Sequence, residues 1–233
     1  MKKLLSLLFI FCSFAYAAPY AEKSQDELKQ LFNIEQSGEA YNINVDLPGL
    51  IEITKNLESH ALNYPVLFDN EADQKNAIRD VIYLTNIMDV IYPKFEKEII
   101  LLSLTLRLNN VAYNLGIQQD VSSARVLKAA EGIFLIEPNN IETNYRLGYF
   151  LAASGKSDVA KPYLEKAAEA GVINANYTLG LIALDEGNDQ EAIKQLTIFK
   201  DKSENKDEVA KLIDAIEKGE PKKDSAKTED AKK

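Results

Sequence analysis

The sequence predicts an all-α protein, a solenoid of antiparallel helix pairs with an N-terminal helical segment before it and a capping helix after it. Three observations support this prediction. A five-residue motif recurs at a fixed period, capping residues open amphipathic stretches elsewhere in the chain, and only residues 41–45 alternate like a strand. That stretch is too short to outweigh the helical pattern.

The repeat lies in the second half of the chain. Residues 112–116 (AYNLG) recur as 144–148 (NYRLG) and as 176–180 (NYTLG), with a spacing of 32 both times. Three further pairs of residues keep this spacing: Gly155 and Gly187, Ala160 and Ala192, and Leu164 and Leu196. One helix pair cannot cover its own apolar face, so stacked units should share a continuous core.

The second unit shows how each helix pair is built. Residues 141–153 form its first helix, which ends at a turn where Gly155 suits the left-handed conformation. Ser157 or Asp158 should cap the second helix, and Gly171 should stop it. The glycine of the motif is interpreted as a helix-packing residue in each unit: Gly116, Gly148 and Gly180.

The segment before the repeats is predicted to be helical. We expect helices over residues 24–36, 46–62 and 70–91, each opened by capping residues or a first-turn proline. Tyr92-Pro93 should break the chain, because proline lacks a helical donor. A long apolar helix then ends at Asn114.

The end of the chain supplies a cap and a tail. Residues 204–218 form a polar helix with one apolar face: Val209, Leu212, Ile213 and Ile216. From Gly219 the tail is mostly Lys, Asp, Glu, Ala and Pro, which should leave it disordered. The predicted organisation is a signal peptide at 1–17, a helical segment at 18–93, repeats at 94–201, a capping helix at 202–218 and a disordered tail at 219–233.

The repeated residues resemble the tetratricopeptide repeat, in about three units over residues 95–201. The likeness rests on Leu-Gly in the motif, Ala early in the second helix, and Pro138-Asn139-Asn140 closing the first unit. Residues 166–171 (KAAEAG) are similar to the related Sel-like repeat. The resemblance implies a right-handed solenoid. Two features depart from the family: the period is 32 where about 34 is usual, and its early Trp is replaced by Ala112, Asn144 and Asn176.

In tetratricopeptide repeats the first helices line a concave groove that binds peptides. Carried over by position, this groove would show Tyr113 and Ile117, then Glu142, Tyr145 and Tyr149, then Asn174, Tyr177 and Leu181. Tyrosine combines apolar area with a hydroxyl at low entropic cost, which suits an interface. The alternative is that the repeated rings are packing residues that fill each helix pair.

The first residues have the features of a secretory signal peptide. Lys2 and Lys3 precede an apolar run from Leu4 to Phe14, and residues 15–17 (AYA) suit cleavage after Ala17. That run is too short to span a bilayer and no later stretch is long enough, so we expect no membrane insertion of the mature chain. The mature chain has no Cys, which suits an oxidising compartment. We predict a periplasmic protein, with secretion as the alternative.

Composition argues against several classes of function. The chain has 27 basic and 36 acidic residues, a formal charge of −9, which argues against nucleic-acid binding. One Cys and one His cannot form an intramolecular disulfide or a His-rich metal site. His60 is expected to be a partly exposed helix residue, and residues 185–189 an ordinary turn without calcium-loop spacing. Since no catalytic or phosphate-binding motif occurs, we predict no enzyme activity, cofactor or metal.

Three functions fit these observations. The favoured one is an exported envelope scaffold or assembly factor that binds a protein partner in its groove. The second is an immunity or inhibitor protein whose acidic surface neutralises a basic toxin or hydrolase. The third is a hydrolase that uses paired carboxylates, which composition alone leaves open. The sequence predicts neither the partner's identity nor the oligomeric state.

Overall fold

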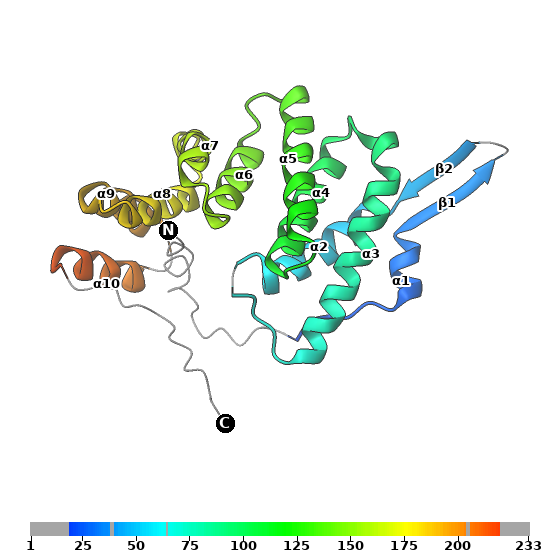
Figure 1. Ribbon diagram of the computed structural model, residues 1–233, viewed down its shortest axis with the longest axis horizontal. Helices are drawn as coiled ribbons and strands as arrows, with labels where there is room; N and C mark the ends of the chain where they lie inside the picture. Colours follow the sequence, from blue (N-terminus) through cyan, green and yellow to red (C-terminus); the bar gives the residue numbers. More distant parts are fainter. Residues whose placement is uncertain (1–18, 38–39, 64, 204–205, 220–233) are drawn as a thin grey trace. The chain divides into compact units, whose positions relative to one another are not determined.

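The computed structural model describes residues 19–37, 40–63, 65–203 and 206–219 (Figure 1). The predicted signal peptide and the predicted tail beyond Gly219 lie outside these residues. Within them the chain consists of helices and one antiparallel pair of strands. The all-α class is therefore confirmed.

The described chain divides into two compact units. We call residues 19–143 the N-terminal unit and residues 144–219 the C-terminal unit. The sequence places a boundary at residue 93, but the units separate fifty residues later. The reason is that the helices on either side of residue 93 pack against each other.

The N-terminal unit is built around one apolar helix. Its elements are α1 (Gln25–Gln30), β1 (Phe32–Ser37), β2 (Ala40–Val45), α2 (Leu47–Ala61), α3 (Glu71–Phe95), α4 (Ile99–Asn114) and α5 (Gln119–Ile136). α4 packs against α2, α3 and α5. Eleven of its 16 residues are buried, because apolar residues occupy nearly every side of the helix.

The predicted helix over residues 24–36 is only half right. The capping box is present, since the Ser24 hydroxyl accepts from the Glu27 amide at 3.2 Å and the Glu27 carboxylate from the Ser24 amide at 2.8 Å. However, α1 ends at Gln30, and the chain continues as β1, paired with β2 from Phe32↔Val45 to Ser37↔Ala40. Apolar and polar residues alternate from Phe32 onward, which is the period of a strand.

The predicted break at Tyr92-Pro93 is wrong by one turn. α3 continues through Pro93 and ends at Phe95. Pro93 lacks the amide that would bond to the Asp89 carbonyl, and its ring crowds that carbonyl, yet the helix continues for two more residues. The predicted starts of α2 and α3 are confirmed, because the side chains of Asp46 and Asn70 cap them.

The C-terminal unit holds the regular part of the repeat. Its elements are α6 (Ile141–Ala153), of which the first three residues fall in the N-terminal unit, α7 (Ser157–Glu169), α8 (Ile173–Asp185), α9 (Asp189–Lys202) and α10 (Lys206–Glu217). The pairs α6–α7 and α8–α9 pack closely at a glycine. A Cβ on Gly148 would lie 2.8 Å from Leu164 Cγ, and one on Gly180 would lie 2.8 Å from Leu196 Cγ. Both are helix-packing glycines, as predicted.

Left-handed glycines end four helices of this unit: Gly155, Gly171, Gly187 and Gly219. Gly155 has φ +77°, and its N–H bonds to the Ala152 carbonyl at 3.0 Å. The next N–H, of Lys156, bonds to the Leu151 carbonyl at 2.8 Å. This pair of bonds is the Schellman motif, which satisfies carbonyls left free at a helix end.

The predicted cap of α7 is wrong. Ser157 is already the first helical residue, and Lys156 stands at the cap position without a side-chain hydrogen bond. In α9 the same position, directly after the turn glycine, holds Asn188, whose side chain accepts from the Glu191 amide at 3.2 Å. The turn therefore fixes where each second helix begins.

The motif alignment predicts the wrong role for Gly116 in the first unit. Gly116 has φ +74° and ends α4 with the same bonding pattern as Gly155 and Gly187. A Cβ on Gly116 would meet no atom within 4 Å, so it is not a packing glycine like Gly148. The cause is helix length, because α4 has 16 residues where α6 and α8 have 13.

Because Gly116 is a turn glycine, Tyr113 does not occupy the position that Tyr145 and Tyr177 share. Tyr145 and Tyr177 each stand ten residues before the turn glycine of their unit. Ten residues before Gly116 is Leu106, which is buried. Tyr113 lies instead in the last turn of α4.

α10 covers the last helix pair. Val209 and Ile213 are buried against Leu196 and Phe199 of α9, and Leu212 and Ile216 are partly buried beside them. The predicted apolar face of the capping helix is confirmed.

Candidate functional site

Three tyrosines of the C-terminal unit form a row on its first helices. The rings of Tyr145 and Tyr149, one turn apart on α6, have centroids 6.3 Å apart. On α8, Tyr177 interacts electrostatically with Tyr149, and its ring lies 4.9 Å from the ring of Phe199 on α9. All three side chains are half-buried. We call Tyr145, Tyr149 and Tyr177 the tyrosine row.

Burial raises the pKa of both Tyr149 and Tyr177 far above the ordinary tyrosine value. The neighbouring Tyr145 adds to the shift at Tyr149, and Tyr149 and the Glu208 carboxylate add to it at Tyr177. Both hydroxyls therefore stay neutral at any physiological pH. A neutral phenol can donate one hydrogen bond and also accept.

Tyr177 also contributes to the core of the unit. Its ring is partly buried against the apolar cluster that joins α9 to α10. Most of the Tyr177 side chain, its hydroxyl included, is therefore packed, and only a smaller part of it stays accessible.

The other predicted groove residues have different surroundings. Asn174 and Glu142 are exposed, whereas Leu181 is only 4% exposed and offers a partner little area. In the N-terminal unit, Ile117 is partly buried against the core. The backbone carbonyl of Tyr113 accepts a hydrogen bond from the side-chain amide Nε2 of Gln119 at 3.1 Å. Of the eight predicted residues, the structure brings together the tyrosine row.

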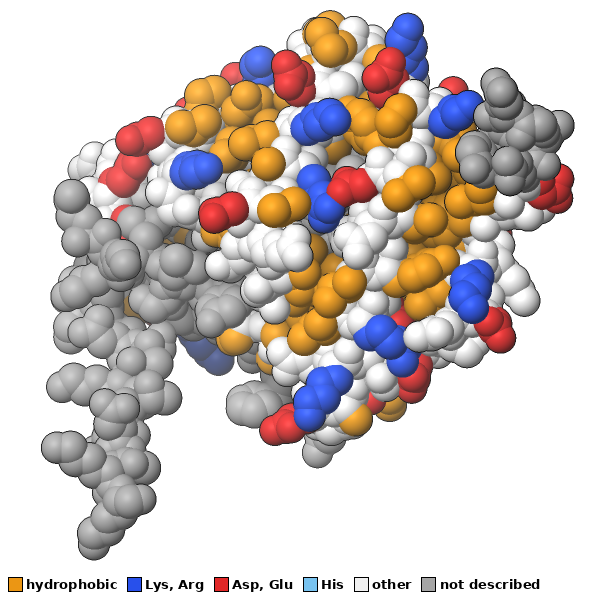
Figure 2. Space-filling view, turned by 45° about the vertical axis from the view of Figure 1, so that its right-hand side comes forward, with side chains coloured by type: hydrophobic (Ala, Val, Ile, Leu, Met, Phe, Trp, Pro, Cys, Tyr) orange, Lys and Arg blue, Asp and Glu red, His pale blue; other side chains and the backbone are white. Residues whose placement is uncertain are grey.

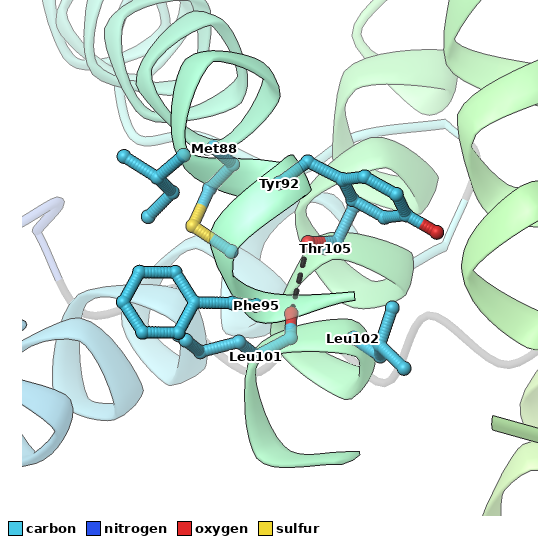
Figure 3. Close-up of a pocket in the computed structure, with 7 residues that line it drawn as sticks. Met88, Tyr92, Phe95, Leu101, Leu102 and Thr105 are labelled. Carbon is cyan, nitrogen blue, oxygen red and sulfur yellow. Dashed lines mark hydrogen bonds between the residues drawn. The ribbon is translucent and has the colours of Figure 1, made fainter. Parts of the chain in front are cut away.

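A small apolar hollow opens between the end of α3 and the start of α4 (Figure 3). It is lined by Met88, Ile91, Tyr92, Phe95, Leu101, Leu102 and Thr105. Its empty space, open solvent included, is about 180 Å³, below the roughly 300 Å³ at which ligand sites begin. The Thr105 hydroxyl donates to the Leu101 carbonyl at 2.8 Å, so its proton is not available to a ligand.

A buried polar network ties residues 19–24 to α3, and the sequence analysis missed it. Asp80 is fully buried and accepts from the Tyr20 hydroxyl at 2.8 Å. Arg79 donates to the other Asp80 oxygen at 2.7 and 3.0 Å and to Glu22 at 3.0 Å. Burial and the Asp80 carboxylate raise the pKa of Tyr20. The available signal was the position of Asp80, which shares the core-facing side of α3 with Ala77 and other buried apolar residues.

His60 belongs to the same region. It is 4% exposed, so the expectation of a partly exposed histidine is wrong. Its ring stacks on Phe68 with centroids 5.2 Å apart and meets the edge of Tyr20 at 5.6 Å. Nδ1 lies 2.8 Å from the Asn56 carbonyl oxygen and 3.0 Å from Ser59 Oγ. Through its contact with Tyr20, His60 helps to hold residues 19–24 against the N-terminal unit.

Two further kinds of site, for metal ions and for a membrane, concern the described residues. No group of three or more His, Cys, Asp or Glu side chains in that part of the chain is placed to hold a metal ion. None of the helices described there has the length and apolar character needed to cross a bilayer.

Comparisons with known proteins give no relative. No family model, no curated protein and no solved structure matches this chain.

Proposed function

We propose that the protein is an exported scaffold or assembly factor that binds a protein partner through the first helices of its C-terminal unit. The observation that carries the proposal is the tyrosine row. Its rings are held by packing, yet each side chain leaves part of its surface accessible. Aromatic side chains held in this way are typical anchors of protein interfaces.

The regularity of the unit supports this proposal. Tyr145 and Tyr177 occupy the same position of successive helix pairs, each of which has a packing glycine and a Schellman turn. Rigid helices present the rings with little freedom left to lose on binding. Such preorganisation lowers the entropic cost of association.

Export of the chain is part of the proposal. The basic start, apolar run and small-x-small pattern of the first 17 residues support it. Cell fractionation and N-terminal sequencing of the mature protein test it. We expect a product that begins at Ala18 and is found in the envelope compartment.

The partner proposal is tested by affinity capture from the envelope fraction with the chain from residue 18 as bait. Tyr145→Ala removes a ring of the row. Tyr163→Ala is the matched control, because it removes a half-buried tyrosine from α7, a second helix of the same unit. We expect one stoichiometric partner that is lost with Tyr145→Ala and kept with Tyr163→Ala.

Both variants must remain folded, which circular dichroism and thermal melting verify. Equal capture by the wild type and both variants would place any interaction elsewhere. Loss of the partner with both variants would indicate a general effect on the unit and contradict the proposal.

A further inference from the structure

The β1–β2 hairpin of the N-terminal unit extends away from the helices of that unit (Figure 1). Its base is anchored, since Phe32 is 5% exposed and Ile43 and Val45 are partly buried against the core. On the same face, Ile34 lies on β1 directly opposite Ile43 and is 39% exposed. A two-stranded hairpin is marginal on its own, and a third strand or a covering layer stabilises it.

The alternation of hydrogen-bonded and non-hydrogen-bonded residue pairs along the hairpin shows which backbone groups point outward. The Asp46 amide donates to the Leu31 carbonyl at 2.9 Å, and the register pairs Asn33 with Asn44. In an antiparallel ladder the intervening residues direct their N–H and C=O groups away from the partner strand. On β2 these are residues 41, 43 and 45. No backbone hydrogen bond from another described residue meets Ile43 on that outer edge.

This edge lacks the features that normally prevent strand pairing. Exposed edges are usually protected by Lys, Pro, a bulge or a covering element. β2 reads AYNINV, with no charge and no proline. The whole chain carries a formal charge of −9, and charged side chains are spread over the face in Figure 2. Two copies of so acidic a chain repel each other, so an uncharged strand is a place where they can approach.

The sequence of β2 is also complementary to itself. If two β2 strands pair antiparallel with Ile43 opposite Ile43, each Asn42 stands opposite Asn44 of the other copy. Residues 41, 43 and 45, whose backbone groups face outward, then form the hydrogen-bonded pairs, and no charge enters the ladder. The apolar faces of both hairpins fall on the same side of the sheet.

We propose that β2 is a self-association edge, at which two copies of the chain join their hairpins into one four-stranded antiparallel sheet centred on Ile43. This contact is isologous, because the same strand meets its own copy around a two-fold axis. It lies in the N-terminal unit and is independent of the tyrosine row.

Sedimentation equilibrium of the chain from residue 18, from low to high micromolar concentration, tests the proposal. We expect a monomer–dimer equilibrium. In the variant Asn42→Lys/Asn44→Lys the introduced lysines oppose each other only in the dimer, at the non-hydrogen-bonded pairs where side chains are closest. Its dimer dissociation constant should rise about tenfold or more. Within one hairpin these lysines face Glu35 and Asn33, so they do not disturb the monomer.

The matched control is Asn42→Lys/Asn44→Glu, in which opposite charges meet across the same contact. It should dimerise at least as well as the wild type. General charge cannot explain the expected difference, because the two lysines lower the net negative charge of the chain. If the wild type stays monomeric, β2 does not pair with its own copy, and the proposal is overturned. The edge would then pair with a strand of another protein. A dimer that is equally stable in both variants overturns it too.

A covalent test locates the contact. The chain from residue 18 has no cysteine, so Ile43→Cys provides a single thiol that would face its copy across the two-fold axis. Mild oxidation should convert it to a disulfide-linked dimer, since Cα atoms of a hydrogen-bonded pair lie within disulfide reach. Ile34→Cys, on β1, should remain unlinked. Equal linking at both positions would contradict the proposed register.

Discussion

The two units of this protein use different means to hold their helices together. The C-terminal unit repeats one solution, with a packing glycine and a left-handed turn glycine in each helix pair. The N-terminal unit has one apolar helix at its centre and a buried carboxylate that ties residues 19–24 to α3. The first design depends on close backbone approach, and the second depends on specific polar contacts.

This difference affects how each unit responds to substitution. A repeat distributes its stability over equivalent contacts between neighbours. The network of Tyr20, Asp80 and Arg79 concentrates it, because removing the buried carboxylate leaves the buried Tyr20 hydroxyl without its acceptor. Each unit should therefore be weakened by a different class of substitution.

The largest effect is expected from Asp80→Ala in the N-terminal unit. The substitution leaves the Tyr20 hydroxyl and the Arg79 guanidinium without their buried acceptor. We expect a loss of about 3 kcal/mol of unfolding free energy. Hydrogen exchange measured by mass spectrometry should show faster exchange in residues 19–24 and α3, with α8 and α9 unchanged. Equal acceleration in both units would contradict the comparison.

Asp89→Ala is the control for Asp80→Ala. Asp89 lies on the same helix, is 44% exposed and pairs with Arg125. Exposed ion pairs contribute about 0–1 kcal/mol to stability, so Asp89→Ala should lower the unfolding free energy by less than about 1 kcal/mol.

The next effect separates the two kinds of glycine. In the C-terminal unit, Gly148→Ala places a methyl group against Leu164 and should cost about 2 kcal/mol. Gly116→Ala meets open space but must adopt φ +74°, which costs about 1 kcal/mol. Urea unfolding of both variants checks these values.

Asparagine at the same positions sharpens the test. It tolerates the left-handed conformation at a helix end, so Gly116→Asn should cost less than Gly116→Ala. Gly148→Asn should cost more than Gly148→Ala, because the side chain is larger. The opposite order would restore the alignment in which Gly116 is a packing glycine.

A further effect appears only in alkali. The pKa of Tyr20, Tyr149 and Tyr177 is raised in the folded chain, so these tyrosines contribute stability below the ordinary pKa of about 10 and lose it as pH rises above that value. Above pH 10, each of these three tyrosines should lower the unfolding free energy by about 1.4 kcal/mol per pH unit.

Urea unfolding from pH 8 to 11 measures this slope. Tyr149→Phe should reduce the slope for the C-terminal unit, and Tyr20→Phe should reduce it for the N-terminal unit. An unchanged slope in both variants would mean that these hydroxyls ionise as freely as in the unfolded chain.

The sequence predicted the C-terminal unit well because its signals are local. Gly155, Gly171 and Gly187 mark helix ends through their own backbone preference, and Gly148 and Gly180 share one period. The helix bounds followed from these positions. The tyrosines could be named, but the burial of Tyr177 depends on Phe199 and the cluster between α9 and α10, which no local pattern shows.

The N-terminal unit was harder to predict because its determinants are distant in sequence. Tyr20 meets Asp80 across sixty residues, and β1 becomes a strand only beside β2. Gly116 shares the motif of Gly148 but serves another role, since the length of α4 was not visible in the motif. Period alone does not distinguish a turn glycine from a packing glycine.

We propose that the first-helix face of the C-terminal unit binds a protein partner. The most direct measurement is photo-crosslinking in the cells that make the protein, with a photoreactive phenylalanine derivative replacing Tyr145 in one strain and Tyr163 in another. Our account predicts an adduct with one partner protein from position 145 and none from position 163. An adduct from position 163 alone, or none from either position in folded protein, would contradict it.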